Sequence, residues 1–323
     1  MKKAVQFPGC CCMITVPWGC CTPCRSTGGR AMPRSWRDVT AGSSSSDVFS
    51  LSCASPQEAE DGKHLTTFWK AYGYLFGMNR DKPHTLEVVV DSWPDFKTII
   101  CRPHQKSEHT LLKNEELTFF STDEKVLKRM LTEDSILDWN KYFKIGGIDM
   151  LHTTMLKDIS ATKDVTMRPC HVTHLLELQD PNHLPHLTVS RDVEARISSL
   201  NESHVGLVNK TWKYGDDEKG FQLIKHLISH FPTCCITDEE GRPVSWVLLY
   251  DYCAMGMVYT LPEHRGKGYA KILLSTMAAR LHAQGYPVYC YTEEENQVSY
   301  RLFKKLGFTE DPSYRAAWYE FNY

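Results

Sequence analysis

Residues 258–270 read Val-Tyr-Thr-Leu-Pro-Glu-His-Arg-Gly-Lys-Gly-Tyr-Ala. The stretch begins as an apolar strand end and passes through Arg-Gly-Lys-Gly into residues that favour a helix. Glycines let the backbone approach an anion closely, and the first turn of a helix offers unpaired N–H groups and the positive end of its dipole. Arg265 and Lys267 add positive charge. The segment therefore predicts a binding site for a pyrophosphate group.

The residues around this segment predict alternating strands and helices. Asp238-Glu-Glu-Gly241 has the composition of a hairpin turn between two apolar runs. Apolar residues repeat at helical spacing in 220–231 and again in 270–282. The elements predicted for this half of the chain are helices at 192–200, 220–231, 270–282 and 299–306 and strands at 233–237, 244–250, 255–260, 288–292 and 318–321.

A smaller globular region precedes this one. Short β-branched runs and a stretch with helical spacing predict strands at 86–90 and 98–101 and a helix at 123–138. The polar, threonine-containing stretch at 160–167 is the best candidate for a boundary. We therefore predict an α+β fold class, with one domain at 63–165 and a second at 166–323.

Residues 1–62 differ in composition from the rest of the chain. Cys, Ser, Gly and Pro dominate, apolar periodicity is absent, and we expect a disordered, Cys/Ser-rich extension. Basic residues from Lys2 to Arg37 precede the first acid, Asp38, which is the charge bias of a mitochondrial presequence. Prolines interrupt the amphipathic helix that such a presequence would form.

Composition argues against several classes of protein. Lys plus Arg total 37 against 39 for Asp plus Glu, so the basic excess of a nucleic-acid-binding protein is missing. No stretch reaches the roughly 18 uninterrupted apolar residues of a membrane span. Cys21-Thr-Pro-Cys24 has the spacing of a zinc-binding pair, but no second Cys/His pair follows at finger distance. We predict no nucleic-acid partner, no membrane span and no metal.

A second motif follows the glycine segment, namely Asn296-x-x-Ser-x-x-Leu-Phe-x-Lys-Leu-Gly-Phe308. In this order and separation, Arg265-x-x-Gly-x-Ala270 and this motif resemble the Gcn5-related acyltransferase superfamily. The resemblance implies a mostly antiparallel central sheet with flanking helices, and a loop that binds the pyrophosphate of coenzyme A. The cofactor-binding residues that it implies are Val258, Thr260, Arg265, Gly266, Lys267, Gly268, Tyr269, Ala270 and Asn296.

A narrower resemblance extends from about residue 70 to the end of the chain. It rests on Val88-Val-Val-Asp-Ser-Trp-Pro-Asp-Phe96, Gly206-Leu-Val-Asn-Lys-Thr-Trp212, Phe231-Pro-Thr-Cys-Cys235, Pro243-Val-Ser-Trp246 and Thr260-Leu-Pro-Glu263. These segments are similar to the glycine N-acyltransferase and glycine N-acyltransferase-like family. That family implies transfer of an acyl group from acyl-coenzyme A to the amino group of glycine or another small amino acid, in the mitochondrion.

The expected proton acceptor and donor are both absent. The family places a glutamate eight residues after the tryptophan of the Val-Ser-Trp element, and this position holds Ala254. The superfamily's usual acidic tyrosine is replaced by Phe303. An amine with a pKa near 8 or above needs a base at neutral pH. The catalytic residues are therefore unknown, with Asp251, His264 and Glu293 as candidates.

We therefore expect an acyl-coenzyme A:amino acid N-acyltransferase that uses coenzyme A as co-substrate and acts as a monomer on small molecules. Two alternatives stay open, a protein or peptide amine acetyltransferase and a non-catalytic acyl-coenzyme A binding protein. The expected location is mitochondrial, with the cytoplasm as the alternative. The acyl chain length and the choice between glycine, glutamine and other acceptors do not follow from the sequence.

Overall fold

The computed structural model describes residues 3–6, 13–16, 69–93, 95–104, 115–133 and 135–323. The strands are β1 (Lys3–Gln6), β2 (Met13–Val16), β3 (Leu86–Val90), β4 (Thr98–Pro103), β5 (Glu116–Ser121), β6 (Phe143–Asp149), β7 (Met167–Glu177), β8 (Ile197–Ser198), β9 (Thr233–Thr237), β10 (Pro243–Leu249), β11 (Met255–Thr260), β12 (Tyr289–Glu293) and β13 (Ala316–Phe321). The α-helices are α1 (Trp69–Met78), α2 (Glu124–Thr132), α3 (Thr153–Thr162), α4 (Arg191–Ala195), α5 (Val205–Thr211), α6 (Glu218–His230), α7 (Tyr269–Ala283) and α8 (Gln297–Lys305).

The strands form two sheets. The larger has nine strands in the order β1-β2-β3-β4-β5-β6-β13-β7-β12, and the smaller has four in the order β11-β10-β9-β8. Within the described residues, neighbouring strands run antiparallel except in the pairs β2–β3 and β5–β6. The predicted α+β fold with a mostly antiparallel sheet is confirmed.

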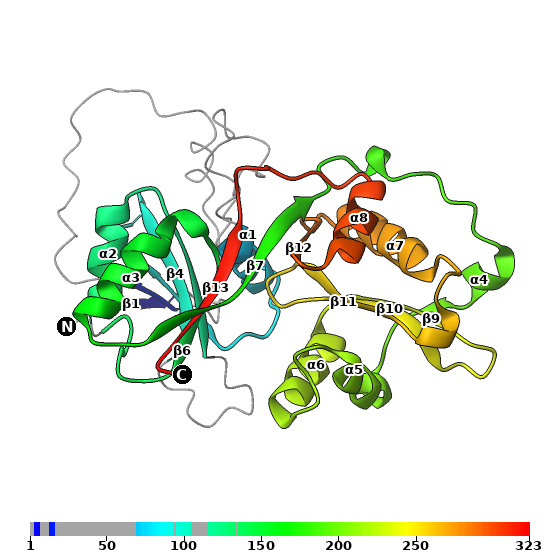
Figure 1. Ribbon diagram of the computed structural model, residues 1–323, viewed down its shortest axis with the longest axis horizontal. Helices are drawn as coiled ribbons and strands as arrows, with labels where there is room; N and C mark the ends of the chain where they lie inside the picture. Colours follow the sequence, from blue (N-terminus) through cyan, green and yellow to red (C-terminus); the bar gives the residue numbers. More distant parts are fainter. Residues whose placement is uncertain (1–2, 7–12, 17–68, 94, 105–114, 134) are drawn as a thin grey trace.

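The last strand of the chain ties the two predicted domains together. β7 begins at Met167, close to the predicted boundary, and β13 lies between β6 and β7. Ala317 of β13 pairs with Ile148 on one side and with Val172 on the other. A strand from the C-terminal region is therefore hydrogen-bonded to a strand of the region before residue 166, and one sheet runs through both regions (Figure 1).

Helices cover both faces of the smaller sheet. Figure 1 shows α7 and α8 on one side of β9, β10 and β11, and α5 and α6 on the other. Leu273 and Met277 of α7, Leu227 of α6 and Trp246 of β10 are each at most 1% exposed and belong to one apolar cluster. Burial of each such side chain stabilises the fold by about 1.5–3 kcal/mol, so this core fixes the position of β10 and its neighbour β11.

The sheets separate between β11 and β12. β11 is the edge of the smaller sheet and β12 is the edge of the larger one. The two strands lie next to one another without a shared ladder (Figure 1). An opening between them is therefore bounded by two strands whose buried residues, Met255 of β11 and Cys290 of β12, belong to one apolar core.

The structure differs from the expectation at residues 192–200. The helix predicted at 192–200 ends at Ala195, because Ile197 and Ser198 extend as β8 and pair with Ile236 and Cys235 of β9. In the described part of residues 1–62, β1 pairs antiparallel with β2, and β2 pairs in parallel with β3. Residues 1–2, 7–12 and 17–62, with the cysteine motif, lie outside the described residues.

Candidate functional site

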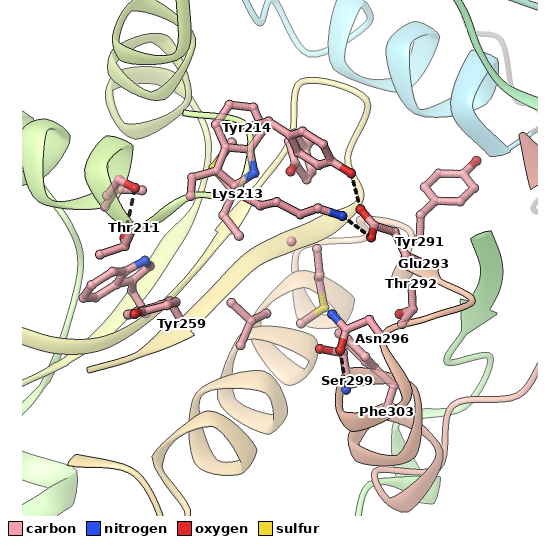
Figure 2. Close-up of a pocket in the computed structure, with 18 residues that line it drawn as sticks. Thr211, Lys213, Tyr214, Tyr259, Tyr291, Thr292, Glu293, Asn296, Ser299 and Phe303 are labelled. Carbon is pink, nitrogen blue, oxygen red and sulfur yellow. Dashed lines mark hydrogen bonds and ion pairs between the residues drawn. The ribbon is translucent and has the colours of Figure 1, made fainter. Parts of the chain in front are cut away.

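A cleft of about 350 Å³ lies where β11 and β12 separate (Figure 2). β11 and β12 form two walls, α8 contributes a third, and the end of α5 with the residues after it contributes a fourth. The lining residues are Val208, Thr211, Trp212, Lys213, Tyr214, Trp246, Tyr250, Met255, Gly256, Met257, Val258, Tyr259, Tyr291, Thr292, Glu293, Asn296, Ser299 and Phe303.

The β11 wall carries a bulge. The pairing of β10 with β11 shifts register, so that Trp246 faces Tyr259 but Leu248 faces Gly256. Met257 and Val258 are thus opposite a single residue, and Met257 has a positive φ of 51°. A bulge leaves one residue outside the hydrogen-bonded ladder. A bulge therefore lies at Met257 and Val258, on a strand that lines the cleft.

The glycine loop before α7 has a backbone conformation that glycine adopts readily and other residues rarely adopt. Gly266 and Gly268 both have φ of 77°, and no atom lies within 4 Å of the position that a Cβ would take at either one. Gly268 is the N-cap of α7 and offers no side chain to the N–H groups of the first turn, which contains no acidic residue. Arg265 and Lys267 are exposed beside them. The loop therefore presents backbone donors and positive charge to solvent.

Arg265 connects this loop to the cleft. Its Nε donates to the Thr260 carbonyl oxygen at 3.1 Å, and its guanidinium lies 5.5 Å from the centre of the Tyr259 ring, which lines the cleft. The Thr260 hydroxyl lies 2.7 Å from that of Ser245. Thr260 thus acts by holding the strand end and Arg265 in place.

The remaining predicted cofactor residues either support the first turn of α7 or line the cleft. Tyr269 is buried, and its hydroxyl accepts from Arg196 Nη2 at 3.4 Å, so it anchors the first turn of α7. Ala270 is half-buried in the same turn. Asn296 lines the cleft and caps α8, because its Oδ1 accepts from the Ser299 backbone N–H at 3.1 Å.

The structure separates the three candidate bases. Glu293 lines the cleft, whereas Asp251 and His264 are not among the lining residues. His264 stacks on Tyr269, and its Nδ1 is buried with no hydrogen-bond partner in the part of the chain that the structure describes. Asp251 lies in the turn between β10 and β11, where removal from water raises the pKa of its carboxyl to about 6.

Glu293 is held by two side chains from the segment after α5. Its carboxylate accepts from Lys213 Nζ at 2.6 Å and from the Tyr214 hydroxyl (Figure 2). Burial raises the pKa of Glu293, but these two hydrogen bonds outweigh burial, so the pKa lies below its ordinary value. Glu293 is therefore ionised at neutral pH.

The comparisons with known proteins agree with this geometry. The family described as aralkyl acyl-CoA:amino acid N-acyltransferase matches residues 61–232, more than half of the chain. The chain belongs to this acyltransferase family. The FR47-like protein family matches residues 235–318, the part that contains the glycine loop and most of the cleft. The prediction of an acyl-coenzyme A-dependent N-acyltransferase is therefore confirmed for the family.

Individual relatives of this acyltransferase point the same way. The glycine N-acyltransferase of Bos taurus is 28% identical over 267 residues, which cover 78% of this chain and 90% of the relative. The glycine N-phenylacetyltransferase of Bos taurus is 28% identical over 260 residues, 76% of this chain and 88% of the relative. A solved Drosophila structure, 16% identical, covers 82% of this chain and 93% of its own with a TM-score of 0.64, which supports the fold alone.

The two positions at which the sequence departs from the pattern that the resemblance implies differ in setting. Ala254 is 1% exposed and belongs to the apolar core, and its carbonyl oxygen accepts from the Tyr250 backbone N–H at 2.9 Å. Phe303 lines the cleft and packs edge-on against Phe308. Ala254 has no polar group to offer, and Phe303 places an apolar ring where a hydroxyl is expected.

Sequence reasoning missed the segment at 212–214. Trp212 and Tyr250 both line the cleft, while Lys213 and Tyr214 hydrogen-bond Glu293 at the end of β12. The segment therefore connects the wall at the end of α5 to the β12 wall. It lies about 80 residues before Glu293 in the sequence, so no local spacing could reveal the contact.

Other sites are not evident in the described ranges. No three His, Cys, Asp or Glu side chains gather there as they would around a metal ion. The same residues contain no helix long and apolar enough to cross a membrane.

Proposed function

We propose that this acyltransferase moves an acyl group from acyl-coenzyme A to the amino group of glycine, with N-acylglycine and coenzyme A as products. The observation that carries the proposal is the link between the glycine loop and the cleft, because Arg265 of the loop lies against Tyr259 of the cleft wall. If the loop binds the pyrophosphate of acyl-coenzyme A, the arm that carries the thioester can enter the cleft between β11 and β12.

The loop would hold the pyrophosphate through backbone donors at Gly266, Gly268 and the first turn of α7. Its two positive φ angles and the space around both glycines support close approach by an anion. Arg265 and Lys267 would add charge, and Asn296 would flank the pantetheine arm from the start of α8.

The bulge in β11 would stabilise the reacting carbonyl. Attack by an amine puts negative charge on the thioester oxygen, and a backbone N–H that points away from the ladder can donate to it. Val258 is the residue that the bulge and the superfamily resemblance both favour for this role. Holding both reactants in one cleft lowers the barrier by up to about 7–11 kcal/mol in favourable cases.

Glycine is the acceptor named for the relatives, and the cleft of about 350 Å³ suits a small amino acid beside an acyl arm. We extend the proposal to action as a monomer in the mitochondrion, in line with the family resemblance and the basic bias of the first residues.

A second candidate function rests on Ala254 and Phe303, which remove the family's base and the superfamily's acid. On this alternative the protein binds acyl-coenzyme A without turnover. The glycine loop would serve both functions equally, so only a measurement of turnover separates them.

The test is release of coenzyme A thiol from benzoyl-, phenylacetyl- and acetyl-coenzyme A in the presence of glycine, glutamine or a lysine-containing peptide. The proposal expects thiol release that depends on glycine, with N-acylglycine detected by mass spectrometry. Release with the peptide alone would identify a protein acetyltransferase. Tight coenzyme A binding by calorimetry without release from any pair would identify the non-catalytic alternative.

A further inference from the structure

We propose that Lys213 and Glu293 form the receptor for the two charges of a free amino acid acceptor, with Lys213 binding its carboxylate and Glu293 binding its amino group. This inference rests on the proposed function and specifies the class of acceptor, an α-amino acid with an unblocked carboxylate.

The two side chains reach into the cleft from opposite walls. Lys213 follows α5 and Glu293 ends β12, and their charged atoms meet at 2.6 Å (Figure 2). The Lys213 side chain is 63% exposed, so its ammonium can turn toward a ligand without a change in the fold. Glu293 is more enclosed, with 23% of its side chain exposed, and the Tyr214 hydroxyl fixes its carboxylate from a second direction.

The charges of the pair are matched to a zwitterion. The hydrogen bond to Glu293 raises the pKa of Lys213, and the hydrogen bonds from Lys213 and Tyr214 lower that of Glu293, so both groups are charged at neutral pH. An amino acid that enters between them offers a carboxylate to Lys213 and an ammonium group to Glu293. One ion pair is thereby exchanged for two, and no charge in the cleft loses its partner.

The arrangement also distinguishes among acceptors. An amine without a neighbouring carboxylate, such as the side chain of a lysine in a peptide, would engage Glu293 but leave Lys213 without its partner. A charge-assisted hydrogen bond contributes about 1.5–3 kcal/mol, or roughly 10- to 150-fold in affinity. The pair therefore favours free amino acids over peptide amines. A carboxylate with a lowered pKa is a strong counter-ion and a weak base, so Glu293 is assigned binding of the amino group and not removal of its proton.

An ion pair of the same kind elsewhere provides a control. Lys219 of α6 lies 3.2 Å from Glu115, with 67% and 36% of the two side chains exposed, and neither residue lines the cleft. Lys219→Met removes a lysine from a surface pair without changing the proposed receptor.

The experiment compares glycine with glycinamide, which keeps the amino group and lacks the carboxylate. Thiol release from benzoyl-coenzyme A is measured for the wild type, Lys213→Met, Glu293→Gln and the control Lys219→Met. For Lys213→Met we expect kcat/KM for glycine to fall at least about tenfold through KM, with kcat/KM for glycinamide within about twofold of wild type. Glu293→Gln should raise KM for both acceptors, and Lys219→Met should change neither.

Coenzyme A affinity by calorimetry and the melting temperature report whether each variant folds. If Lys213→Met does not fold, Lys213→Arg is used, and retention of most of the preference for glycine supports a binding role for the positive charge. If the Lys213→Met enzyme still prefers glycine over glycinamide as strongly as wild type does, the inference is overturned. The proposed function would stand in that case. A wild-type protein that releases no thiol with any acceptor overturns both.

Discussion

The Tyr250 ring occupies the space that any side chain at position 256 would need. A Cβ added to Gly256 would lie 2.3 Å from Cε2 of Tyr250. The ring cannot move aside easily, because it stacks on Tyr252 with 5.0 Å between the two ring centroids. Gly256 is therefore required where the bulge of β11 faces the cleft.

The substitution Gly256→Ala tests this contact. Relief of the overlap must displace Tyr250 or β11, so we expect the free energy of unfolding to fall by about 1–3 kcal/mol. The KM for acyl-coenzyme A should rise in the fraction that remains folded, because the displaced groups line the cleft. Urea denaturation and thiol-release kinetics measure the two effects.

Gly206→Ala is the matched control, since Gly206 lies in α5 and no atom lies within 4 Å of an added Cβ. It should be neutral or stabilising by up to about 1 kcal/mol. If the two variants had the same free energy of unfolding and the same KM, Tyr250 would be able to move without an energetic cost. The overlap at position 256 would then not determine the form of the cleft.

Much of this wall of the cleft could be predicted from the sequence, because its signals are local. The strand at 255–260 and the turn at 238–241 depend on apolar residues and turn residues within a few positions. The pyrophosphate loop is equally local, because Gly266 and Gly268 adopt the positive φ that their residue type allows. Short-range chemistry decides such elements, so a single sequence contains the information.

Long-range pairings could not be predicted in the same way. The position of β13 between β6 and β7 depends on partners about 150 residues away, such as Val172 and Ile148 for Ala317. Ile197 forms a strand because it pairs with Ile236 of β9, although the residues around it have helical spacing. The bridge from Lys213 to Glu293 has the same origin. Such contacts are set by packing between elements and have no signature in local periodicity.

Gly268→Asp tests the anion-binding loop. Gly268 is exposed at the N-terminus of α7, so an aspartate there would place a negative charge where the pyrophosphate is proposed to bind. We expect the dissociation constant for coenzyme A to rise by about 100-fold or more, measured by isothermal titration calorimetry.

Gly268→Asn separates charge from shape, because asparagine has the same size and also tolerates a positive φ. It should weaken binding by less than about tenfold. Similar losses in both variants would trace the effect to the backbone, and unchanged affinity in the aspartate variant would exclude this loop as the coenzyme A site.

Lys70→Met tests a buried charge that joins the two regions of the chain. Lys70 of α1 is 1% exposed, binds the Glu116 carboxylate and lies 4.9 Å from the centre of the Trp318 ring of β13. Removing the ammonium deletes the ion pair and the cation–π contact. We expect the free energy of unfolding to fall by about 2–4 kcal/mol in urea denaturation.

Lys141→Met provides the comparison, because its pair with Asp138 at 3.5 Å has 73% and 48% of the side chains exposed. The expected change is within about 0.5 kcal/mol. If Lys70→Met lowered the free energy of unfolding no more than Lys141→Met does, the buried ammonium would not stabilise the contact between the two regions.

Asp251→Asn tests both the stability and the chemistry of the turn beside the cleft. Removal from water raises the pKa of Asp251 from 3.8 to about 6, with Lys70 opposing the change and Glu116 reinforcing it. Between these two pH values the folded state binds more protons than the unfolded state, so the free energy of unfolding falls as the pH rises from about 4 to 6. Above pH 6 the charged carboxylate destabilises the fold by up to about 3 kcal/mol.

The asparagine variant should therefore be more stable than wild type at pH 7.5 and should lose that advantage as the pH falls to 4, measured by thermal denaturation across this range. Asp138→Asn should have the opposite sign, because the backbone hydrogen bond from Asn140 lowers the pKa of Asp138. Asp251 is not among the residues that line the cleft, so thiol release by Asp251→Asn should stay within about threefold of wild type. A stabilised, folded variant with at least about 100-fold lower kcat would instead identify Asp251 as the base that takes over from the glutamate missing at position 254.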